Sequence, residues 1–424
     1  MQAIIKPGKL IGTLKVPASK SMMQRACAGA ILHKGKTTIY NPGFSDDDKA
    51  ALQIIQQLGA KIIFQSEEKI EIISDGVVHA AYEIDCSESG LSTRMFTPIA
   101  AISSNKIKIT GKGSLLQRPM NDFGSILTDL GVDLFDFRGF IPFTVQGPLL
   151  PKNLTMDGSV SSQFLTGVLF ALSAIAQNSI TINVQHLKSK PYVAMSLQML
   201  EQFGKKIVNN NYEKFIIDPS KFEYKDDVEI NIESDWSSAA YWLVGAAIHG
   251  NVSLENLNKE SLQADRKILD ALNDAGCNVV EKGNQLHVAT STLKAFHFDA
   301  TDAPDLFPIL SILAANCEGE SSIKSLHRLI HKESNRANSI AEMLTAFGVR
   351  FKMENDSLFI EGTKKLKAAH INSYHDHRIA MAAAIGALNA DGEVAIENGE
   401  AVSKSYPEFL KHLKYSGIDV RLSS

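Results

Sequence analysis

The chain has 424 residues, of which 44% are hydrophobic and 21% charged, and its formal net charge is −4. This length exceeds what one ordinary hydrophobic core serves, so the composition indicates a folded protein of two or more domains. The slightly acidic balance excludes the broad basic field of a nucleic-acid-binding protein. Any anion that the chain binds must therefore be held by a local cluster of cations.

Signal-peptide, membrane and disulfide patterns are not found in the sequence. The N-terminus lacks a signal-peptide core, and the longest nearly apolar run, residues 165–176, is far below the roughly 18 residues of a membrane span. The four cysteines are Cys27, Cys86, Cys277 and Cys317. They show neither CxxC pairing nor clustering with histidine, so we predict buried, reduced thiols, no metal site and no cofactor. We expect a cytoplasmic protein with no membrane or nucleic-acid partner.

One pattern recurs six times along the chain: an amphipathic helix, a glycine and then a strand. The glycines are Gly59, Gly131, Gly204, Gly276, Gly348 and Gly417. A nearly constant spacing of about 70 residues indicates an internal repeat. Glycine suits the end of a helix because the residue there often needs a positive φ.

A second helix is predicted upstream of each glycine. These helices begin near Ser21, Ser92, Ser162, Ser238, Phe307 and Arg378. Each repeat then reads strand, helix, strand, helix, strand, strand, and is closed by hairpins such as residues 61–73 and 349–362. Repeats of this size are too small to be stable alone, so we expect two groups of three.

Residues 16–26, VPASKSMMQRA, form the first segment with concentrated chemistry. Ser19 is a good N-cap, and Lys20, Ser21 and Arg25 follow in the first turns of the predicted helix. Free backbone N–H groups and the helix dipole favour an anion at such a start. An ordinary solvated, capped helix remains an open alternative for this segment taken alone.

The rest of the first half repeats this placement of polar groups at helix starts and in one loop. The residues are Gly90, Arg94, Arg118, Ser161, Ser162, Gln163, Ser189 and Tyr192. Glycine allows a ligand to approach the backbone, and serine and glutamine supply short hydrogen-bonding groups. Surface exposure, serine capping or an interface role would explain any one of them singly.

The second half is richer in acidic and basic side chains near helix starts. They are Asp305, Lys332, Glu333, Arg336, Asp376, His377, Arg378 and Lys404. The HDH sequence resembles a set of metal ligands, but Arg378 directly after it would repel a cation. So many cations in one chain predict multiply anionic ligands that carry phosphate and carboxylate together. The usual motifs of covalent catalysis, nucleotide hydrolysis and hydride transfer are missing, which leaves acid/base group transfer.

Seven segments in order along the chain resemble the 3-phosphoshikimate 1-carboxyvinyltransferase (EPSP synthase) family of enolpyruvyl transferases. They are PASKSMMQRA, LLQRPM, SSQF, SKPY, HKESNR, DHRIAMA and SKSYPEF. The resemblance implies a two-domain α/β fold called an inside-out α/β barrel, with six βαβαββ units in two groups of three. One domain would comprise residues 1–19 and 233–424, and the other residues 20–232. The substrates would bind between the two domains, and the protein would be a monomer.

The resemblance also implies a reaction. The enolpyruvyl group of phosphoenolpyruvate would pass to the 5-hydroxyl of shikimate 3-phosphate, with release of phosphate, in the shikimate pathway to chorismate and the aromatic amino acids. Asp305 would take the hydroxyl proton, and Glu333 would protonate the methylene carbon with help from Lys20. Cations around Glu333 tend to lower its pKa and desolvation tends to raise it, and the sequence leaves that balance open.

Binding roles follow from the same resemblance. The residues implied for shikimate 3-phosphate are Lys20, Ser21, Arg25, Ser161, Ser162, Gln163, Ser189, Tyr192, Asp305 and Lys332. Those implied for phosphoenolpyruvate are Lys20, Gly90, Arg118, Gln163, Arg336, Arg378 and Lys404.

The chain departs from the family pattern at two places, and two other functions are alternatives. Glu88 and Leu91 stand where many members have asparagine and threonine, and Arg328 stands where relatives often have asparagine or glutamate. A related transferase that acts on UDP-N-acetylglucosamine places a reactive cysteine in the loop matching residues 113–123, and this loop has none. A catalytically inactive anion-binding protein of the same fold is the second alternative, which retention of Asp305, Glu333 and Lys20 disfavours.

Overall fold

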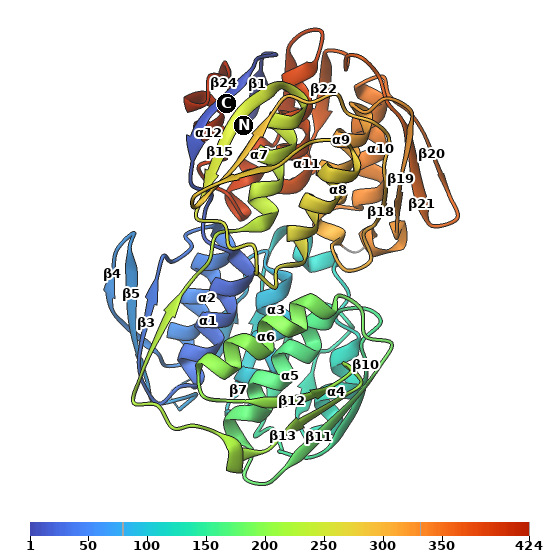
Figure 1. Cartoon of the computed structure of the whole chain (residues 1–424). Helices are drawn as coiled ribbons and strands as arrows, with labels where there is room; N and C mark the ends of the chain where they lie inside the picture. The colour runs from blue at the N-terminus through green and yellow to red at the C-terminus, as the bar shows by residue number, and fades with distance from the viewer. Residues whose placement is uncertain (79, 331, 424) are drawn as a thin grey trace. The chain divides into compact units, whose positions relative to one another are not determined.

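The computed structural model describes residues 1–78, 80–330 and 332–423, and the chain divides into two compact units. Unit 1 comprises Met1–Pro17 and Ser234–Ser424, and unit 2 comprises Ala18–Glu233. Two backbone hydrogen bonds lie next to the points where the chain passes from one unit to the other. The Ser19 N–H donates to the Glu233 carbonyl at 2.8 Å within unit 2. Within unit 1, the Asp235 N–H donates to the Pro17 carbonyl at 2.9 Å. Each unit is described by itself below (Figure 1).

The described part of each unit contains three four-stranded sheets that share one strand order. In unit 2 the first sheet has the order β14 (Asp227–Asn231), β3 (Gly35–Tyr40), β5 (Lys69–Ser74), β4 (Lys61–Gln65). The second sheet has the order β6 (Glu83–Asp85), β7 (Lys106–Thr110), β9 (Phe143–Gln146), β8 (Asp133–Phe135). The third sheet has the order β10 (Leu154–Asp157), β11 (Ile180–Gln185), β13 (Lys214–Ile217), β12 (Ile207–Asn210). In unit 1 the first sheet has the order β2 (Leu10–Leu14), β15 (Gly250–Glu255), β17 (Gln285–Ala289), β16 (Val280–Lys282). The second sheet has the order β18 (His297–Asp299), β19 (Glu320–Lys324), β21 (Ser357–Glu361), β20 (Arg350–Glu354). The third sheet has the order β22 (Ala369–Asn372), β23 (Val394–Glu397), β1 (Gln2–Ile5), β24 (Val420–Ser423). The predicted hairpins at residues 61–73 and 349–362 are confirmed as the antiparallel pairs β4–β5 and β20–β21.

Two α-helices accompany each sheet. The first helices are α1 (Lys20–Leu32), α3 (Gly90–Ala100), α5 (Ser162–Ile175), α7 (Trp236–His249), α9 (Phe307–Ala315) and α11 (His377–Gly386). The second helices are α2 (Asp46–Gln57), α4 (Asp122–Asp129), α6 (Lys190–Gln202), α8 (Ile268–Asp274), α10 (Arg336–Ala346) and α12 (Phe409–Tyr415). Short 3-10 turns are η1 (Gly113–Gln117), η2 (Pro219–Lys221), η3 (Ala264–Lys267), η4 (Pro304–Leu306), η5 (Leu326–Leu329), η6 (Ala387–Asn389) and η7 (Gly399–Lys404). All six repeat glycines have φ between +72° and +114°, which confirms their predicted role at the helix ends.

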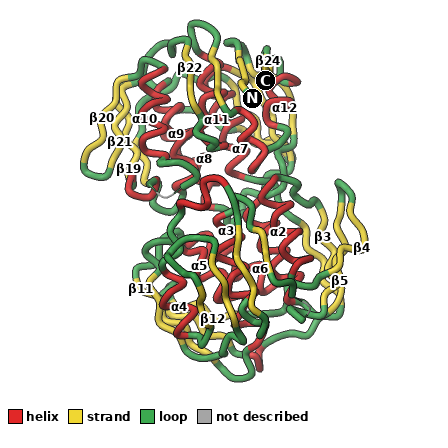
Figure 2. The backbone as a smooth tube through the Cα atoms, turned by 180° about the vertical axis from the view of Figure 1, so that it is seen from behind, coloured by secondary structure: helices red, strands yellow, loops and turns green. Residues whose placement is uncertain are grey.

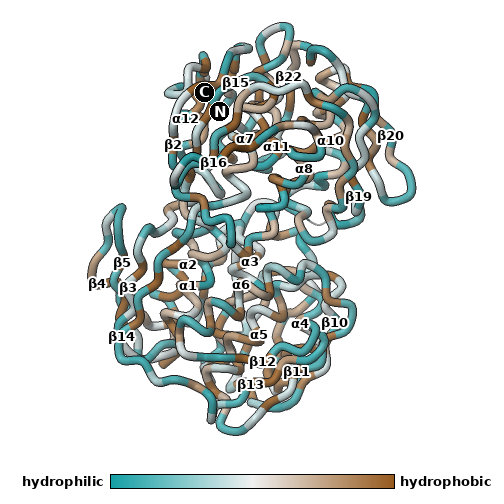
Figure 3. Tube along the Cα trace, in the orientation of Figure 1, coloured by the Kyte–Doolittle hydropathy of each residue, from teal (hydrophilic) through white to brown (hydrophobic). Residues whose placement is uncertain are grey.

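The first helices form the interior of each unit. Every residue of α3 and of α9 is buried, and α9 has the sequence FPILSILAA. A helix that is apolar on all sides must be surrounded by other elements, and here the sheets lie outside the helices (Figure 2). Apolar residues gather accordingly on the inner helices (Figure 3). The fold is therefore the predicted two-domain inside-out α/β architecture, with six βαβαββ repeats in two groups of three.

Strands are exchanged along the chain in three of the repeats. β14 pairs in parallel with β3, and so supplies the first strand of the repeat that contains α1. β2 pairs in parallel with β15 and begins the repeat of α7, while β1 completes the last repeat between β23 and β24. These three repeats are therefore not continuous in sequence. No helix in the described ranges is both long and apolar enough to span a bilayer.

Candidate functional site

The start of α1 carries Lys20 in a defined ion pair. The Lys20 Nζ lies 2.8 Å from Oδ2 of Asp47, which stands in the first turn of α2. Ser19 is the N-cap residue, but its side chain forms no capping hydrogen bond and its buried hydroxyl has no partner among the described residues. The expected side-chain cap is therefore not formed. The first backbone N–H groups of α1 keep their capacity to bind an anion.

Arg25 links α1 to α6 inside unit 2. Its Nε donates to the Ser196 hydroxyl at 2.9 Å, and its two terminal nitrogens donate to the carbonyls of Ser21 at 2.7 Å and Tyr192 at 3.1 Å. Burial lowers the pKa of Arg25 to about 10, although the nearby Tyr192 opposes the shift. The guanidinium stays charged at neutral pH, and it links two other predicted site residues, Ser21 and Tyr192, to Arg25.

The start of α5 gathers the predicted SSQ residues. Ser161 is the N-cap and accepts from the Gln163 N–H at 3.3 Å, so capping accounts for one of the two serines. The Gln163 Oε1 accepts from Arg94 on α3 at 3.0 Å. Ser189, the N-cap of α6, is buried and has a φ of +54°. Arg94 therefore orients Gln163, a role that its sequence position alone did not predict.

Gly90 and Arg118 are in direct contact. A Cβ added at Gly90 would lie 2.6 Å from Cζ of Arg118, so only glycine leaves room for the guanidinium. Glu88 has its carboxylate against Gly113 and accepts from the Ser114 N–H at 3.4 Å. The Glu88 carboxylate thus contacts the start of η1.

In unit 1, Asp305 lies at the centre of a cluster of cations. Its Oδ1 is 2.8 Å from Arg336 and 3.2 Å from Lys332, and its Oδ2 is 3.0 Å from Arg378. Three helix starts supply these side chains, because Asp305 belongs to η4 before α9, Arg336 begins α10 and Arg378 lies in the first turn of α11. Burial would raise the pKa of Asp305, but Arg378, Lys332 and Arg336 together lower it well below its ordinary value.

The Arg336 guanidinium contacts three carboxylates. Besides Asp305, it pairs with Glu333 and with Asp376, whose Oδ2 lies 2.8 Å from Nε. Burial disfavours the charged form, yet Asp376, Glu333 and Asp305 raise the pKa of Arg336 well above its ordinary value. Two carboxylates of this cluster, Asp305 and Glu333, therefore lie on the same guanidinium, as an acid/base pair in one site would require.

Other side chains support this cluster. Arg378 Nη2 donates to the Ser237 hydroxyl at 3.4 Å, and that hydroxyl donates to Asp265. Burial raises the pKa of Asp265 to about 6, although Arg378 opposes the shift. The Lys404 Nζ donates to the carbonyl of His375 at 2.7 Å, on the segment before α11.

Sequence reasoning assigned no role to several of these partners. Asp47 lies in the run Ser45-Asp46-Asp47-Asp48, which reads as an ordinary capped helix start, and Ser45 does form a capping box with Asp48. Asp376 belongs to the HDH sequence, and it is the N-cap of α11 and a partner of Arg336. Among the described residues, no group of three or more histidine, cysteine, aspartate or glutamate side chains has a metal-binding arrangement.

Thiol reagents are expected to leave the native protein unmodified. All four cysteines are buried, and burial raises the pKa of Cys86 and of Cys317 to about 12, so their thiols stay protonated. Labelling with a chromogenic disulfide should be slow in buffer and should reach all four thiols in denaturant. Rapid native labelling that tracks loss of activity would contradict this prediction.

Three comparisons with known proteins give one result. A family model described as EPSP synthase (3-phosphoshikimate 1-carboxyvinyltransferase) matches residues 4–413. Relatives named 3-phosphoshikimate 1-carboxyvinyltransferase include one from Clostridium acetobutylicum, 36% identical over 98% of this chain and 97% of its own length. Another, from Clostridium beijerinckii, is 34% identical over 97% of both chains. The solved EPSP synthase of Acinetobacter baumannii aligns with a TM-score of 0.81 at 26% identity, over 99% of this chain and all of that one.

Proposed function

Because the chain belongs to the 3-phosphoshikimate 1-carboxyvinyltransferase (EPSP synthase) family, we propose that the clusters described above bind its two substrates and carry its chemistry. The reaction transfers the enolpyruvyl group of phosphoenolpyruvate to the 5-hydroxyl of shikimate 3-phosphate and releases phosphate, in the shikimate pathway. Both substrates are small molecules with several negative charges. The cations around Asp305 are the observation that carries the assignment of residues.

Unit 2 supplies most of the proposed groups for shikimate 3-phosphate. The set is Lys20, Ser21, Arg25, Ser161, Ser162, Gln163, Ser189 and Tyr192, with Asp305 and Lys332 added from unit 1. Its support lies in the start of α1, where backbone N–H groups and Lys20 favour a phosphate, and in the hydroxyls at the start of α5. Arg25, buried and bonded to two carbonyls, holds α1 and α6 in register for this set.

Phosphoenolpyruvate carries a carboxylate and a phosphate, and we assign both to guanidinium and ammonium groups. The proposed set is Lys20, Gly90, Arg118, Gln163, Arg336, Arg378 and Lys404. Planar guanidinium groups bind carboxylate and phosphate in a two-pronged manner. Arg336 and Arg378 are already oriented by carboxylates at 2.8 Å and 3.0 Å, so little ordering is left for the substrate to impose.

The transfer needs one acid and one base. Glu333 donates a proton to the methylene carbon of phosphoenolpyruvate, and the 5-hydroxyl oxygen attacks the neighbouring carbon while Asp305 takes the hydroxyl proton. A carbon–oxygen bond forms in this step. The carbon–oxygen bond to phosphate then breaks, a methyl proton returns to the protein, and phosphate leaves. Lys20, held at 2.8 Å from Asp47, assists by stabilising the negative charge on the departing phosphate.

Substrate binding also makes Asp305 a better base. Without substrates, Arg378, Lys332 and Arg336 keep its pKa far too low for efficient proton transfer near neutral pH. The phosphate and carboxylate groups of the substrates compete for these same cations. As the negative charges of the substrates offset these cations, the pKa of Asp305 rises toward its ordinary value, so the base is activated only when both substrates are bound.

Phosphate release tests the function most directly. The purified chain should release phosphate when both substrates are present, and it should release none with either substrate alone. Replacing shikimate 3-phosphate with UDP-N-acetylglucosamine tests the related transferase, and release of phosphate there would favour that reaction. No release with either acceptor from a folded sample would support the inactive binding protein instead.

The Gly90→Ala variant is expected to raise KM for phosphoenolpyruvate by roughly tenfold or more, with a smaller change in kcat, because the new methyl group displaces the Arg118 guanidinium. Steady-state kinetics with varied phosphoenolpyruvate measure this. The matched control is Gly124→Ala on α4, where a Cβ would lie at an ordinary 3.4 Å from Phe137. Equal KM values for the wild type and the Gly90→Ala variant would show that the contact between Gly90 and Arg118 does not contribute to phosphoenolpyruvate binding.

We propose that the two units are the two domains of the family, with boundaries near residues 19 and 233. We also propose that the protein acts as a monomer in the cytoplasm. Sedimentation of the purified chain at several concentrations and fractionation of the source cells test the last two.

A further inference from the structure

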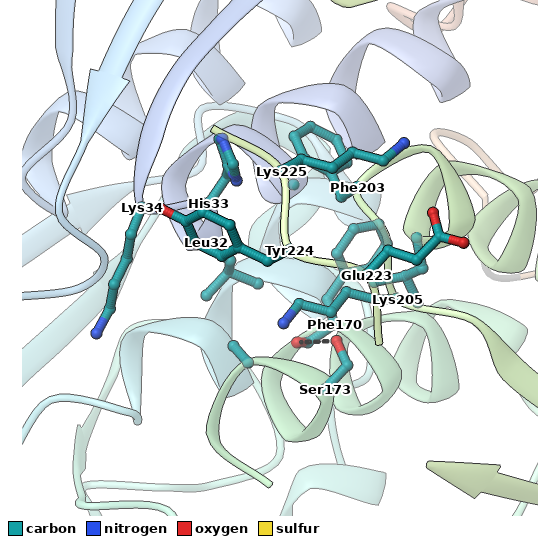
Figure 4. Close-up of a pocket in the computed structure, with 13 residues that line it drawn as sticks. Leu32, His33, Lys34, Phe170, Ser173, Phe203, Lys205, Glu223, Tyr224 and Lys225 are labelled. Atoms are coloured by element: carbon teal, nitrogen blue, oxygen red, sulfur yellow. Dashed lines mark hydrogen bonds between the residues drawn. The ribbon is translucent and has the colours of Figure 1, made fainter. Parts of the chain in front are cut away.

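Unit 2 contains a pocket of about 280 Å³ at the C-terminal ends of three helices (Figure 4). Leu32 lies at the end of α1, Phe170 is in the second half of α5, and Leu200 and Phe203 close α6, and these side chains line the pocket. The proposed substrate-binding groups on these helices, such as Lys20, Ser162 and Tyr192, stand toward the N-terminal ends, and none of the proposed groups lines this pocket. The pocket is therefore separate from the residues proposed for catalysis.

Three lysines border the pocket, and one of them has an evident structural role. Lys225 donates from Nζ to the carbonyl of Gln202 at 2.9 Å, and so caps the end of α6. Lys34 is exposed at the rim. The Nζ of Lys205 lies 4.6 Å from the centre of the Phe222 ring. This cation–π contact stabilises the positive charge less than an anionic partner would.

Lys205 has no carboxylate within ion-pair distance in the described part of the chain. Figure 4 shows the ammonium of Lys205 and the carboxylate of Glu223 pointing to opposite sides. Burial lowers the pKa of Lys205, and the positive charge of Lys34 lowers it further, with no acidic neighbour acting against them. The C-terminal ends of helices carry partial negative charge, and Lys225 offsets it at the end of α6 through its bond to the Gln202 carbonyl. Lys205 and Lys34 add two further positive charges beside an apolar wall, which together make a site for an anion that has an apolar body.

We propose that this pocket binds a small cyclic carboxylate, with its ring against the apolar wall and its carboxylate at Lys205. A cavity of about 150 Å³ already admits a benzene ring, so this pocket has room for one ring and its charged group. Tyr224 borders the pocket and is 83% exposed, so its ring is available to cover the bound ring. Inorganic phosphate would leave the apolar wall in contact with water, so a ring-bearing anion fits better.

Benzoate titrated calorimetrically into the full-length protein tests the proposal. Saturating shikimate 3-phosphate is present throughout, so that benzoate does not occupy that substrate's site. We expect saturable binding, with benzamide, the uncharged isostere, about tenfold weaker or more. The Lys205→Gln variant should weaken benzoate binding by about tenfold, and the Tyr224→Ala variant should weaken it as well. Phosphate should not compete with benzoate.

The matched control is Lys206→Gln. Lys206 is the next residue, is exposed, and pairs with Glu201 at 3.3 Å outside the pocket lining. Its affinity for benzoate should stay within about twofold of the wild type. Absence of saturable binding, equal benzoate affinities in the wild type and Lys205→Gln, or equal affinities for benzoate and benzamide would each overturn the proposal. Turnover of the two substrates by Lys205→Gln should match the wild type, so failure here is distinguishable from failure of the proposed function.

Discussion

The Glu333→Gln variant is expected to turn over about 10²- to 10⁴-fold more slowly than the wild type, with its fold intact. Glutamine keeps the shape of the side chain and one acceptor for the Arg336 guanidinium, but it has no proton of suitable acidity for a carbon atom. The loss should therefore appear in kcat, while both KM values change little. Stopped assays of phosphate release at saturating substrates measure it.

A matched control separates the loss of the acid from the loss of any carboxylate near α10, the helix that begins three residues after Glu333. Glu342 lies two turns into the same helix, is exposed, and accepts a hydrogen bond from the Tyr374 hydroxyl. The Glu342→Gln variant should keep turnover within about twofold of the wild type. If Glu333→Gln kept turnover within tenfold, Glu333 would have to be withdrawn as the acid.

The Asp376→Asn variant is expected to lose about 3–5 kcal/mol of unfolding free energy. Asp376 is fully buried and accepts hydrogen bonds from Arg336 at 2.8 Å and Ser334 at 3.1 Å, and from the backbone N–H of Arg378 at 3.0 Å. Asparagine keeps the cap on α11 but removes a charge that a buried guanidinium requires, and its NH₂ group presents a donor to another donor. Guanidinium chloride unfolding of the full chain measures the loss.

Asp218→Asn is the control for this effect. Asp218 also caps a helical turn, η2, through the Ser220 N–H at 3.1 Å, but it does so at the surface and pairs with no buried cation. Its replacement should cost less than about 1 kcal/mol. A cost equally small for Asp376→Asn would mean that Glu333 and Asp305 alone suffice to hold Arg336.

The repeat and the helix starts were predictable because they depend on residues that are close together in the sequence. Each repeat glycine follows an amphipathic helix and is found with the expected positive φ, and the first helices begin within two residues of the predicted positions. Periodicity and capping act over a few residues, so one sequence suffices to read them. The pairing of β14 with β3 could not be read this way, because tertiary packing chooses the partner among many strands of similar pattern.

The residues of the proposed site were found by a resemblance in motifs, whereas their partners were not. Nothing adjacent in sequence indicates that Lys20 pairs with Asp47, or that Arg94 donates to Gln163. The same limit applies to Ser19, whose position at the N-cap was read correctly although its hydroxyl makes no cap. Side-chain partners depend on how helices approach one another, and that information lies in the packed core rather than in any single segment.

The exchange of strands also fixes the order in which the two units can be completed during synthesis. All strands of unit 2 lie between Ala18 and Glu233, so its sheets are complete as soon as β14 leaves the ribosome. β1 and β2 are made first, but their partners β15, β23 and β24 are made after unit 2. The first seventeen residues therefore stay unpaired until those strands have been synthesised. Gln2 finally pairs with Ser423, which brings the two chain ends side by side in one sheet. A gene permuted to begin at Ala18, with Ser424 joined to Met1 by a short linker, would make each unit from one continuous stretch and abolish that wait.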